Sequence, residues 1–258
     1  MNLKPITITS DFGNCSFYGA AIEGKMLSLQ PLSKIITISN QIRQYDIFQA
    51  SVIVRNSYFH FPENSVHLIL VNNFSMNTDR FVAIKQNNHY FIGSDSGIFS
   101  LLFGKTPEKI ILLKNENIKS PTFPELDICT QAAVHLSEGK DIDELGSQID
   151  YIEEATPYFP SESGNSIKGT VIFIDNYHNA ITNISKQMFD KLNRNNKFTI
   201  YFGNYFTTKI SKTYDYAPEA DLVAVFGSTN LLEIALYKSS ATNLLGIKVY
   251  DTIRIDFE

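Results

Sequence analysis

The sequence predicts a protein of two parts, an N-terminal α/β domain and a C-terminal all-β domain. In the first half, apolar runs of strand length alternate with segments whose apolar residues recur at helical spacing. That order is typical of a mostly parallel sheet flanked by helices and joined by right-handed crossovers. Later in the chain, short β-prone runs separated by turn residues replace the alternation, which fits a small barrel or a sandwich.

Local signals support the elements of the first half. Ile22, Met26 and Leu29 recur at helical spacing, and the Asp46 carboxylate is suited to cap a helix N-terminus. The expected elements are strands over Leu3–Thr9, Lys34–Ser39, Ser65–Val71 and Lys109–Leu113, a hairpin of Phe81–Lys85 and His89–Ile92, and helices over Phe17–Leu29, from Asp46, over Gly97–Phe103 and over Leu126–Leu136.

A linker is expected over Thr156–Ile167, which holds two prolines, three serines and a glycine. We therefore expect a first domain over residues 1–160, a linker over 161–167 and a second domain over 168–258. The strands expected in the second domain are Gly169–Ile174, Lys197–Phe202, Phe206–Ile210, Leu222–Phe226, Leu231–Leu236 and Thr252–Ile255.

Composition argues against several classes of function. The 258 residues carry a net charge of -5 without a Lys/Arg stripe, so nucleic acid is a poor candidate partner. Cys15 and Cys129 lack zinc spacing and form no disulfide framework, which indicates a reduced, cytoplasmic setting. The N-terminus enters a strand-like run without a signal-peptide pattern, and no segment is long enough to span a bilayer, so no membrane partner is expected.

Motifs for metals and nucleotide cofactors are missing from the sequence. There is no HExxH spacing, no Walker-type phosphate loop and no GxGxxG element. We therefore expect no metal and no cofactor. The five histidines examined for ligand spacing are His60, His67, His89, His135 and His178.

Two distant stretches share one chemical pattern. Asp11 and Asp175 each follow an apolar run, at the point where a strand is expected to end. In α/β proteins, ligands bind at the carboxyl ends of strands. The pair suggests a small polar ligand held between an N-terminal and a C-terminal domain.

Several motifs, in order along the chain, resemble the S-adenosylmethionine (SAM) hydroxide adenosyltransferases, relatives of the SAM-dependent fluorinase and chlorinase. The resemblance runs from about Ile6 to Ile255. The motifs are Thr9–Gly13, Tyr18–Ala20, Ile38–Ile42 with Asp46, Tyr58–Pro62, Val66–Leu68, Tyr90–Gly97, Pro121–Phe123, Asp175–Asn183 and Leu232–Ala235.

The resemblance implies an α/β domain followed by a β-barrel domain. It also implies a homotrimer that binds SAM between the N-terminal domain of one subunit and the C-terminal domain of its neighbour. Members of the family attack C5′ of SAM with water or a halide and expel methionine.

In the first domain, the resemblance assigns Asp11 to the ribose diol, for which an ionised carboxylate is a strong acceptor. It assigns substrate contacts to Ser16 and Tyr18, and nucleoside packing to Phe123. Simpler roles stay open: Asp11 could cap a turn, and Tyr18 and Phe123 could serve packing alone.

In the second domain, Asp175 and Asn179 match a polar pair that holds the amino-acid end of SAM. An acceptor and a donor together suit a zwitterion, although these residue types also favour a plain turn. The family has glycine at the position of His178, so the turn backbone here is open, and His178 is interpreted as a turn residue.

The resemblance also assigns adenine recognition to this domain. Ser228 and the segment from Leu236 to Lys238 fall where the family reads adenine. A polar turn is the alternative for Ser228, and a salt bridge or a solvent-facing strand position for Glu233.

The water-activating set of the hydrolytic members is altered. Asn72 replaces an Asp, Asp79 stands at the family Arg with Arg80 beside it, and Pro124 replaces a His. Neither Asn nor Pro can accept a proton from water, and a positioned base contributes about 10²–10⁴-fold. Asn72, Asp79 and Arg80 are the catalytic candidates, with a solvated loop carboxylate as the alternative for Asp79.

Halogenation is not expected. Ser75 lies where the fluorinase has a halide-contacting hydroxyl, but its second halide-contacting serine falls on Glu125, whose charge would repel a halide. The resemblance therefore implies cleavage of SAM by water at C5′ to adenosine and methionine, and the altered water-activating set implies that this cleavage is slow. The alternatives are a SAM- or adenosine-binding trimer without turnover and a transferase using another nucleophile.

Overall fold

The computed structural model describes residues 3–73, 80–115, 118–194, 197–216 and 218–258. The chain forms two compact units, Met1–Thr156 and Pro157–Glu258. Within the described ranges, no helix is long and apolar enough to cross a membrane.

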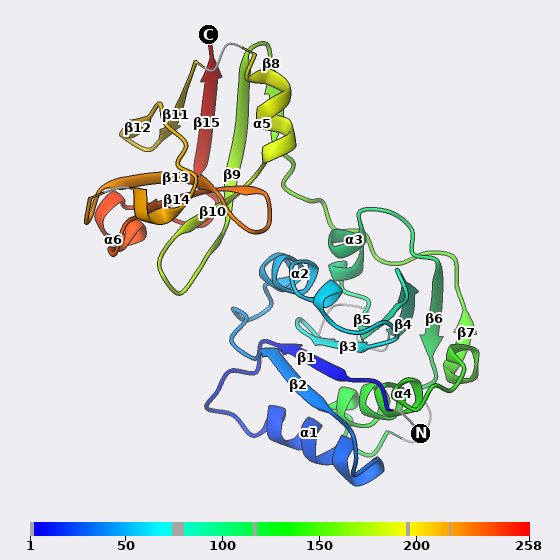
Figure 1. Ribbon diagram of the computed structural model, residues 1–258. Helices are drawn as coiled ribbons and strands as arrows, with labels where there is room; N and C mark the ends of the chain where they lie inside the picture. The colour runs from blue at the N-terminus through cyan, green and yellow to red at the C-terminus, as the bar shows by residue number, and fades with distance from the viewer. Residues whose placement is uncertain (1–2, 74–79, 116–117, 195–196, 217) are drawn as a thin grey trace. The chain divides into compact units, whose positions relative to one another are not determined.

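The first unit is an α/β domain with a mixed sheet (Figure 1). The sheet order is β2-β1-β3-β5-β4-β6-β7, with parallel pairing from β2 through β5 and antiparallel pairing beyond. Its elements are β1 (Ile6–Ser10), α1 (Tyr18–Leu29), β2 (Ile35–Ser39), α2 (Ile47–Arg55), β3 (Val66–Leu70), β4 (Phe81–Gln86), β5 (His89–Ser94), α3 (Ile98–Phe103), β6 (Lys109–Leu113), α4 (Ile128–Ser137) and β7 (Gly146–Gln148), with 3₁₀ turns at Tyr58–His60, Pro124–Leu126 and Ile142–Leu145.

Helices cover both faces of this sheet. Figure 1 shows α1 and α4 on one side and α2 and α3 on the other. Consecutive residues of β3 therefore enter different cores, with Leu68 in one and Ile69 in the other. Ile22 and Met26 of α1 are fully buried, and each such burial contributes about 1.5–3 kcal/mol.

The pairing of β1 with β3 brings together the residues that follow these two strands. These neighbouring strands run parallel, with Ser10 opposite Leu70. The residues that follow each strand are therefore brought to one edge of the sheet. Asp46, as expected, caps α2, accepting a 2.8 Å hydrogen bond from the Gln49 backbone N–H.

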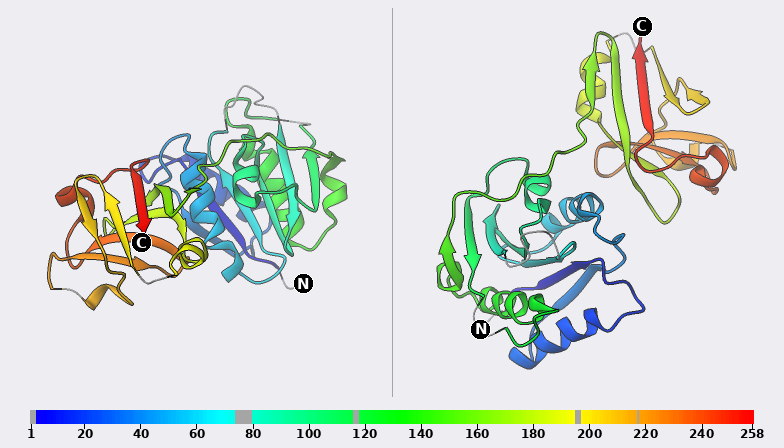
Figure 2. Two further views of the ribbon diagram at one scale, coloured as in Figure 1. Left: turned by 90° about the horizontal axis from the view of Figure 1, so that it is seen from above. Right: turned by 180° about the vertical axis from the view of Figure 1, so that it is seen from behind.

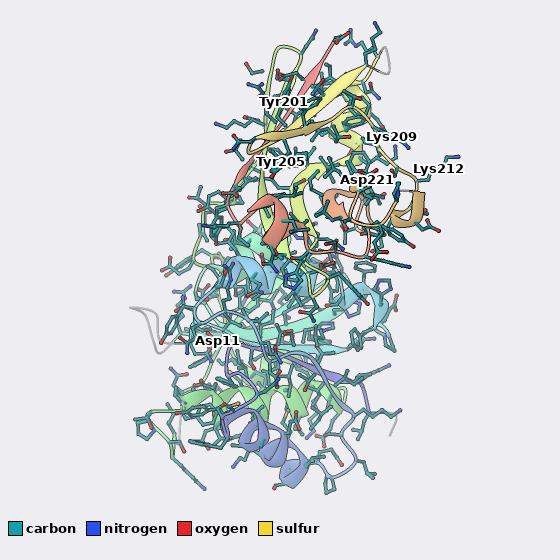
Figure 3. The ribbon with its side chains drawn as sticks, turned by 90° about the vertical axis from the view of Figure 1, so that its left-hand side faces the viewer. Asp11, Tyr201, Tyr205, Lys209, Lys212 and Asp221 are labelled. Carbon is teal, nitrogen blue, oxygen red and sulfur yellow. The ribbon has the colours of Figure 1, made fainter. Side chains whose placement is uncertain are left out.

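The second unit is an antiparallel, barrel-like domain. The sheet order is β12-β11-β15-β9-β10-β14-β13, and β15 lies beside β9 (Figure 2). Its elements are β8 (Ser161–Ser163), β9 (Ser166–Ile174), β10 (Ala180–Ser185), α5 (Lys186–Leu192), β11 (Phe198–Phe202), β12 (Tyr205–Thr207), β13 (Leu222–Phe226), β14 (Leu231–Leu236), α6 (Ala241–Leu245) and β15 (Thr252–Phe257), with a 3₁₀ turn at Tyr214–Tyr216.

Some elements differ from the expectations. Residues 161–167, expected as a linker, form β8 and the start of β9, because Gly164 (φ 58°) makes a tight turn between paired strands. The first compact unit ends at Thr156. Strand β12 spans Tyr205–Thr207 instead of Phe206–Ile210, and β7, β10, α5 and α6 were not expected.

Candidate functional site

Asp11 directly follows β1, and its carboxylate is held by backbone groups. Oδ2 accepts hydrogen bonds from the N–H of Tyr45 at 2.9 Å and of Asn72 at 3.3 Å. Both donors have left-handed backbones, with φ of 64° for Tyr45 and 55° for Asn72. Such backbones are uncommon outside glycine and gather at functional sites. Oδ1 accepts no hydrogen bond from the residues that the structure describes.

Aromatic side chains stand beside Asp11 in one pocket of about 190 Å³. The Tyr18 ring lies 5.0 Å from the Phe123 ring and 5.5 Å from the Phe12 ring, measured between centroids. Phe123 is 7 % exposed and Tyr18 38 %. The pocket is lined by Asp11, Phe12, Tyr18, Gln44, Tyr45, Asn73, Thr122, Phe123 and Glu125.

The pocket also contains a buried polar pair. Glu125 and Asn73 are 1 % and 5 % exposed, and the Asn73 amide donates to Glu125 Oε1 at 2.9 Å. Burial raises the pKa of Glu125, and the charge of Asp11 adds to the shift, against hydrogen bonds from Asn73 and from the Glu125 backbone. From the sequence, Glu125 is expected only to repel a halide, and Asn73 is not among the predicted site residues.

The three catalytic candidates fall in different places. Asn72 contacts Asp11 through its backbone, but its neighbour Asn73 lines the pocket. Arg80 does not line it: its guanidinium pairs with Asp95 at 2.7 Å and donates to the hydroxyl and carbonyl oxygens of Tyr151, each at 3.0 Å. Asp79, like Ser75, lies outside the described residues.

Ser16, expected to contact the substrate, donates to the Phe12 carbonyl at 2.8 Å and is not among the pocket residues.

In the second unit, Asp175 and Asn179 form a closed turn between β9 and β10. The backbone N–H groups of Tyr177 and Asn179 donate to Asp175 Oδ1 at 2.9 and 2.8 Å. The Asn179 amide donates to Oδ2 at 3.0 Å. His178 adopts φ 63°, so it takes the left-handed backbone that glycine favours, and its ring lies 3.2 Å from the Thr242 hydroxyl.

A second pocket, of about 600 Å³, adjoins that turn. It is lined by Asp175, Tyr177, His178, Asn179, Tyr214, Leu236, Tyr237, Lys238 and Ser239. Lys238 has a left-handed backbone, with φ 53°. Ser228 is exposed in the turn after β13 and does not line this pocket.

Glu233 of β14 is 6 % exposed and accepts a short hydrogen bond from the Tyr214 hydroxyl. Burial raises its pKa, and so does the charge of Asp175, while the hydrogen bond from Tyr214 opposes the shift. Neither alternative given for Glu233 holds in the described part of the chain: its side chain is buried rather than solvent-facing, and its partner is a neutral hydroxyl rather than a cation.

Each unit thus gathers part of the predicted set. Asp11, Tyr18 and Phe123 meet in the first pocket, and Asp175, Asn179, Leu236 and Lys238 meet in the second. One sequence signal could have found Asn73, because it follows the strand next to β1. No signal pointed to Tyr45 or Tyr214. In the described part of the chain, no group of three or more His, Cys, Asp or Glu residues is placed to hold a metal.

Known proteins resemble this chain over nearly its full length. It is 26% identical to the (R)-S-adenosyl-L-methionine hydrolase of Methanocaldococcus jannaschii, covering 98% of this chain and 96% of that one. It is 24% identical to the protein of the same name from Thermus thermophilus, covering 98% and 100%.

Solved structures share the fold. A conserved protein from Thermotoga maritima, described as uncharacterized, aligns with a TM-score of 0.89 at 23% identity over 97% of this chain and 99% of that one. A conserved hypothetical protein from Thermus thermophilus aligns with a TM-score of 0.76 at 25% identity over 98% and 100%.

Two family matches cover most of the sequence. Residues 6–146 match the SAM hydroxide adenosyltransferase N-terminal domain, and residues 169–254 match the C-terminal domain of the same family. The chain belongs to the SAM hydroxide adenosyltransferase family.

Proposed function

We propose that this protein binds SAM and cleaves it with water at C5′, giving adenosine and methionine. The observation that carries the proposal is the Asp11 carboxylate, fixed by two backbone N–H groups beside Tyr18 and Phe123 in one pocket. A fixed acceptor next to aromatic faces suits a nucleoside, whose ribose donates hydrogen bonds and whose base stacks. Two curated relatives named as (R)-SAM hydrolases support the reaction.

The pocket of the second unit suits the other end of SAM. Asp175 supplies an acceptor for an ammonium group, and Asn179 is held against it. We propose that the two pockets act together across subunits of a homotrimer, the N-terminal unit of one subunit with the C-terminal unit of the next. SAM enters as the substrate, so the proposal needs no separate cofactor.

Cleavage of SAM does not require all of the water-activating residues of the family. The sulfonium of SAM is an excellent leaving group, so orientation and desolvation of a bound SAM already favour attack at C5′. A second function, binding of SAM or adenosine without turnover, is favoured by one observation. Arg80, the nearest substitute for the family Arg, is engaged with Asp95 and Tyr151.

Turnover and binding assays separate these two functions. Purified protein is incubated with each sulfonium epimer of SAM, and adenosine and methionine are followed by chromatography while calorimetry measures affinity. Release of both products in equal amounts, faster from the R epimer, supports the hydrolase. Measurable affinity with no adenosine from either epimer contradicts it and favours the binding protein.

The subunit arrangement has its own test. Light scattering is expected to give about three times the mass of one chain. A monomer that still cleaves SAM would contradict a site shared between subunits.

A further inference from the structure

Glu125 occupies an unusual position for a carboxylate. It lies in the 3₁₀ turn Pro124–Leu126, is 1 % exposed and lines the same pocket as Asp11. The loop before it is anchored, because Asp127 accepts hydrogen bonds from the backbone N–H groups of Lys119 and Ser120 at 2.8 and 3.1 Å. Glu125 is therefore presented to the pocket by an ordered segment.

The pair formed by Glu125 and Asn73 is incompletely satisfied. Glu125 Oε1 accepts from the Asn73 amide, but Glu125 Oε2 and Asn73 Oδ1 are buried and have no hydrogen-bond partner among the residues that the structure describes. Leaving a buried polar atom unpaired destabilises the fold, and a charged group more than a neutral one. Two unpaired acceptors lining one pocket fit a ligand that brings hydrogen-bond donors, and water carries two.

We propose that Glu125 is the general base of this protein, with Asn73 as its positioning residue, and that the two hold the attacking water through Glu125 Oε2 and Asn73 Oδ1. This inference rests on the proposed function, which supplies SAM to the pocket. It replaces Asn72, Asp79 and Arg80 as the groups that handle water.

The reaction begins with Glu125 ionised and a water molecule beside Oε2. The water oxygen forms a bond to C5′ while one water proton passes to Glu125 Oε2. The C5′–S bond breaks, and its electron pair stays on sulfur, which leaves as the neutral thioether of methionine. The cationic sulfonium and the carboxylate are both neutralised, and Glu125 later returns its proton to solvent.

The surroundings suit this role. Burial raises the pKa of Glu125 toward the range in which a base works best near neutral pH. Among the described residues, the other ionisable groups that line the pocket are Asp11, Tyr18 and Tyr45, and the Cys129 thiol on α4 also interacts with Glu125. Burial also raises the pKa of the Cys129 thiol well above its ordinary value, so this group stays neutral beside the base.

The test compares Glu125→Gln with Glu154→Gln, an exposed glutamate of the same unit. Glutamine keeps the size of the side chain and the acceptor for Asn73 but takes no proton. We expect Glu125→Gln to lower kcat for SAM hydrolysis by about 100-fold or more, with Kd for SAM changed less than about threefold. Glu154→Gln is expected to match the unaltered protein in both quantities.

Azide separates a base from a merely structural carboxylate. Azide is an anion that attacks carbon without losing a proton, so it needs no base, and an ionised Glu125 repels it. With SAM and azide, Glu125→Gln is expected to form 5′-azido-5′-deoxyadenosine and methionine at least about tenfold faster than the unaltered protein. A variant that is damaged in structure would lose this reaction as well.

The outcomes distinguish the two claims. No adenosine from the unaltered protein overturns the proposed function and this inference with it. Full hydrolysis by Glu125→Gln overturns the inference alone, as does slow hydrolysis without the gain in azide transfer. If the variant does not fold, the pH profile of the unaltered protein decides. Because the pKa of Glu125 is raised above its ordinary value of 4.5, kcat must fall as the pH is lowered from about 8 to 4.5, and a flat profile overturns the inference.

Discussion

Acidification is expected to destabilise the first unit through His67. This side chain is 1 % exposed on β3. Its Nδ1 lies 2.8 Å from the Thr7 hydroxyl, and its Nε2 lies 3.1 Å from Nδ1 of His89. Burial, and secondly the neighbouring His89, lower the pKa of His67 from 6.5 to about 3. A protonated His67 therefore fits the folded state poorly.

The magnitude follows from the difference between the two pKa values. As the pH falls below 6.5, His67 is protonated in the unfolded chain but stays neutral in the folded protein. The stability that His67 contributes is therefore fully present above pH 6.5 and is lost as the pH falls toward 3. The loss reaches about 2 kcal/mol at about pH 5 and approaches about 5 kcal/mol at the lower limit.

Urea unfolding at about pH 7.5 and about pH 5 measures this loss. The perturbation is His67→Phe, and the control is the same substitution at exposed His60. His67→Phe is expected to lose about 2 kcal/mol less than the unaltered protein between the two pH values, whereas His60→Phe keeps most of the original loss. Glu125 and Glu233, whose pKa values are raised, oppose the trend equally in all three proteins and cancel in the comparison.

One result would refute the reasoning. If His67→Phe loses as much stability on acidification as the unaltered protein, the proton uptake occurs elsewhere, and the neutral Thr7–His67–His89 chain is not the cause.

Three further predictions use other observations. Asp11→Ala is expected to raise Kd for adenosine and SAM more than about tenfold by calorimetry, and unchanged affinity would remove Asp11 from the site. Gly93→Ala places a Cβ 2.3 Å from the Ile69 carbonyl oxygen and is expected to lower the free energy of unfolding, measured with urea, by more than about 2 kcal/mol. The control Gly24→Ala, in α1, places a Cβ that meets nothing within 4 Å and is expected to raise the free energy of unfolding by about 0.5–1 kcal/mol. Equal effects of the two substitutions would contradict the packing around Gly93. Glu125→Gln is expected to be more stable than the unaltered protein near pH 8, because a raised pKa means that the charged form of Glu125 destabilises the folded state as the pH rises. The difference in melting temperature should vanish below pH 4.5, where Glu125 is protonated in both states. A difference that stays constant with pH would contradict a destabilising charge at Glu125.

The sequence predicts the elements whose signals are local. Lys109–Leu113, Leu222–Phe226 and Leu231–Leu236 are confirmed with the same bounds, because each is an apolar run bounded by turn residues. Strand β10 is not predicted, because Asp175–Asn183 is treated as one motif whose first part, Asp175–Asn179, favours a turn, although β10 begins inside that motif at Ala180. Helix α5 is seven residues long and is marked only by its cap, Ser185, which accepts from the Met188 N–H.

The candidate site was predictable where a residue follows a strand. Asp11 and Asp175 could be found because both stand at strand ends. The partners of Arg80 could not, because Tyr151 lies 71 residues away and meets it only through the tertiary fold. The contact between Asn73 and Glu125 could not be predicted either, because these residues are 52 positions apart and meet only where both segments border the end of β1.

The way in which Asp11 is anchored has a consequence for sugar discrimination. Two amides already occupy Oδ2, and an oxygen of this kind has two lone pairs. In the complex proposed here, a ribose would therefore place its 2′- and 3′-hydroxyls on Oδ1 alone. Telling a ribonucleoside from its 2′-deoxy counterpart then falls to a single atom, whose orientation is set by the backbones of Tyr45 and Asn72 before any nucleoside arrives.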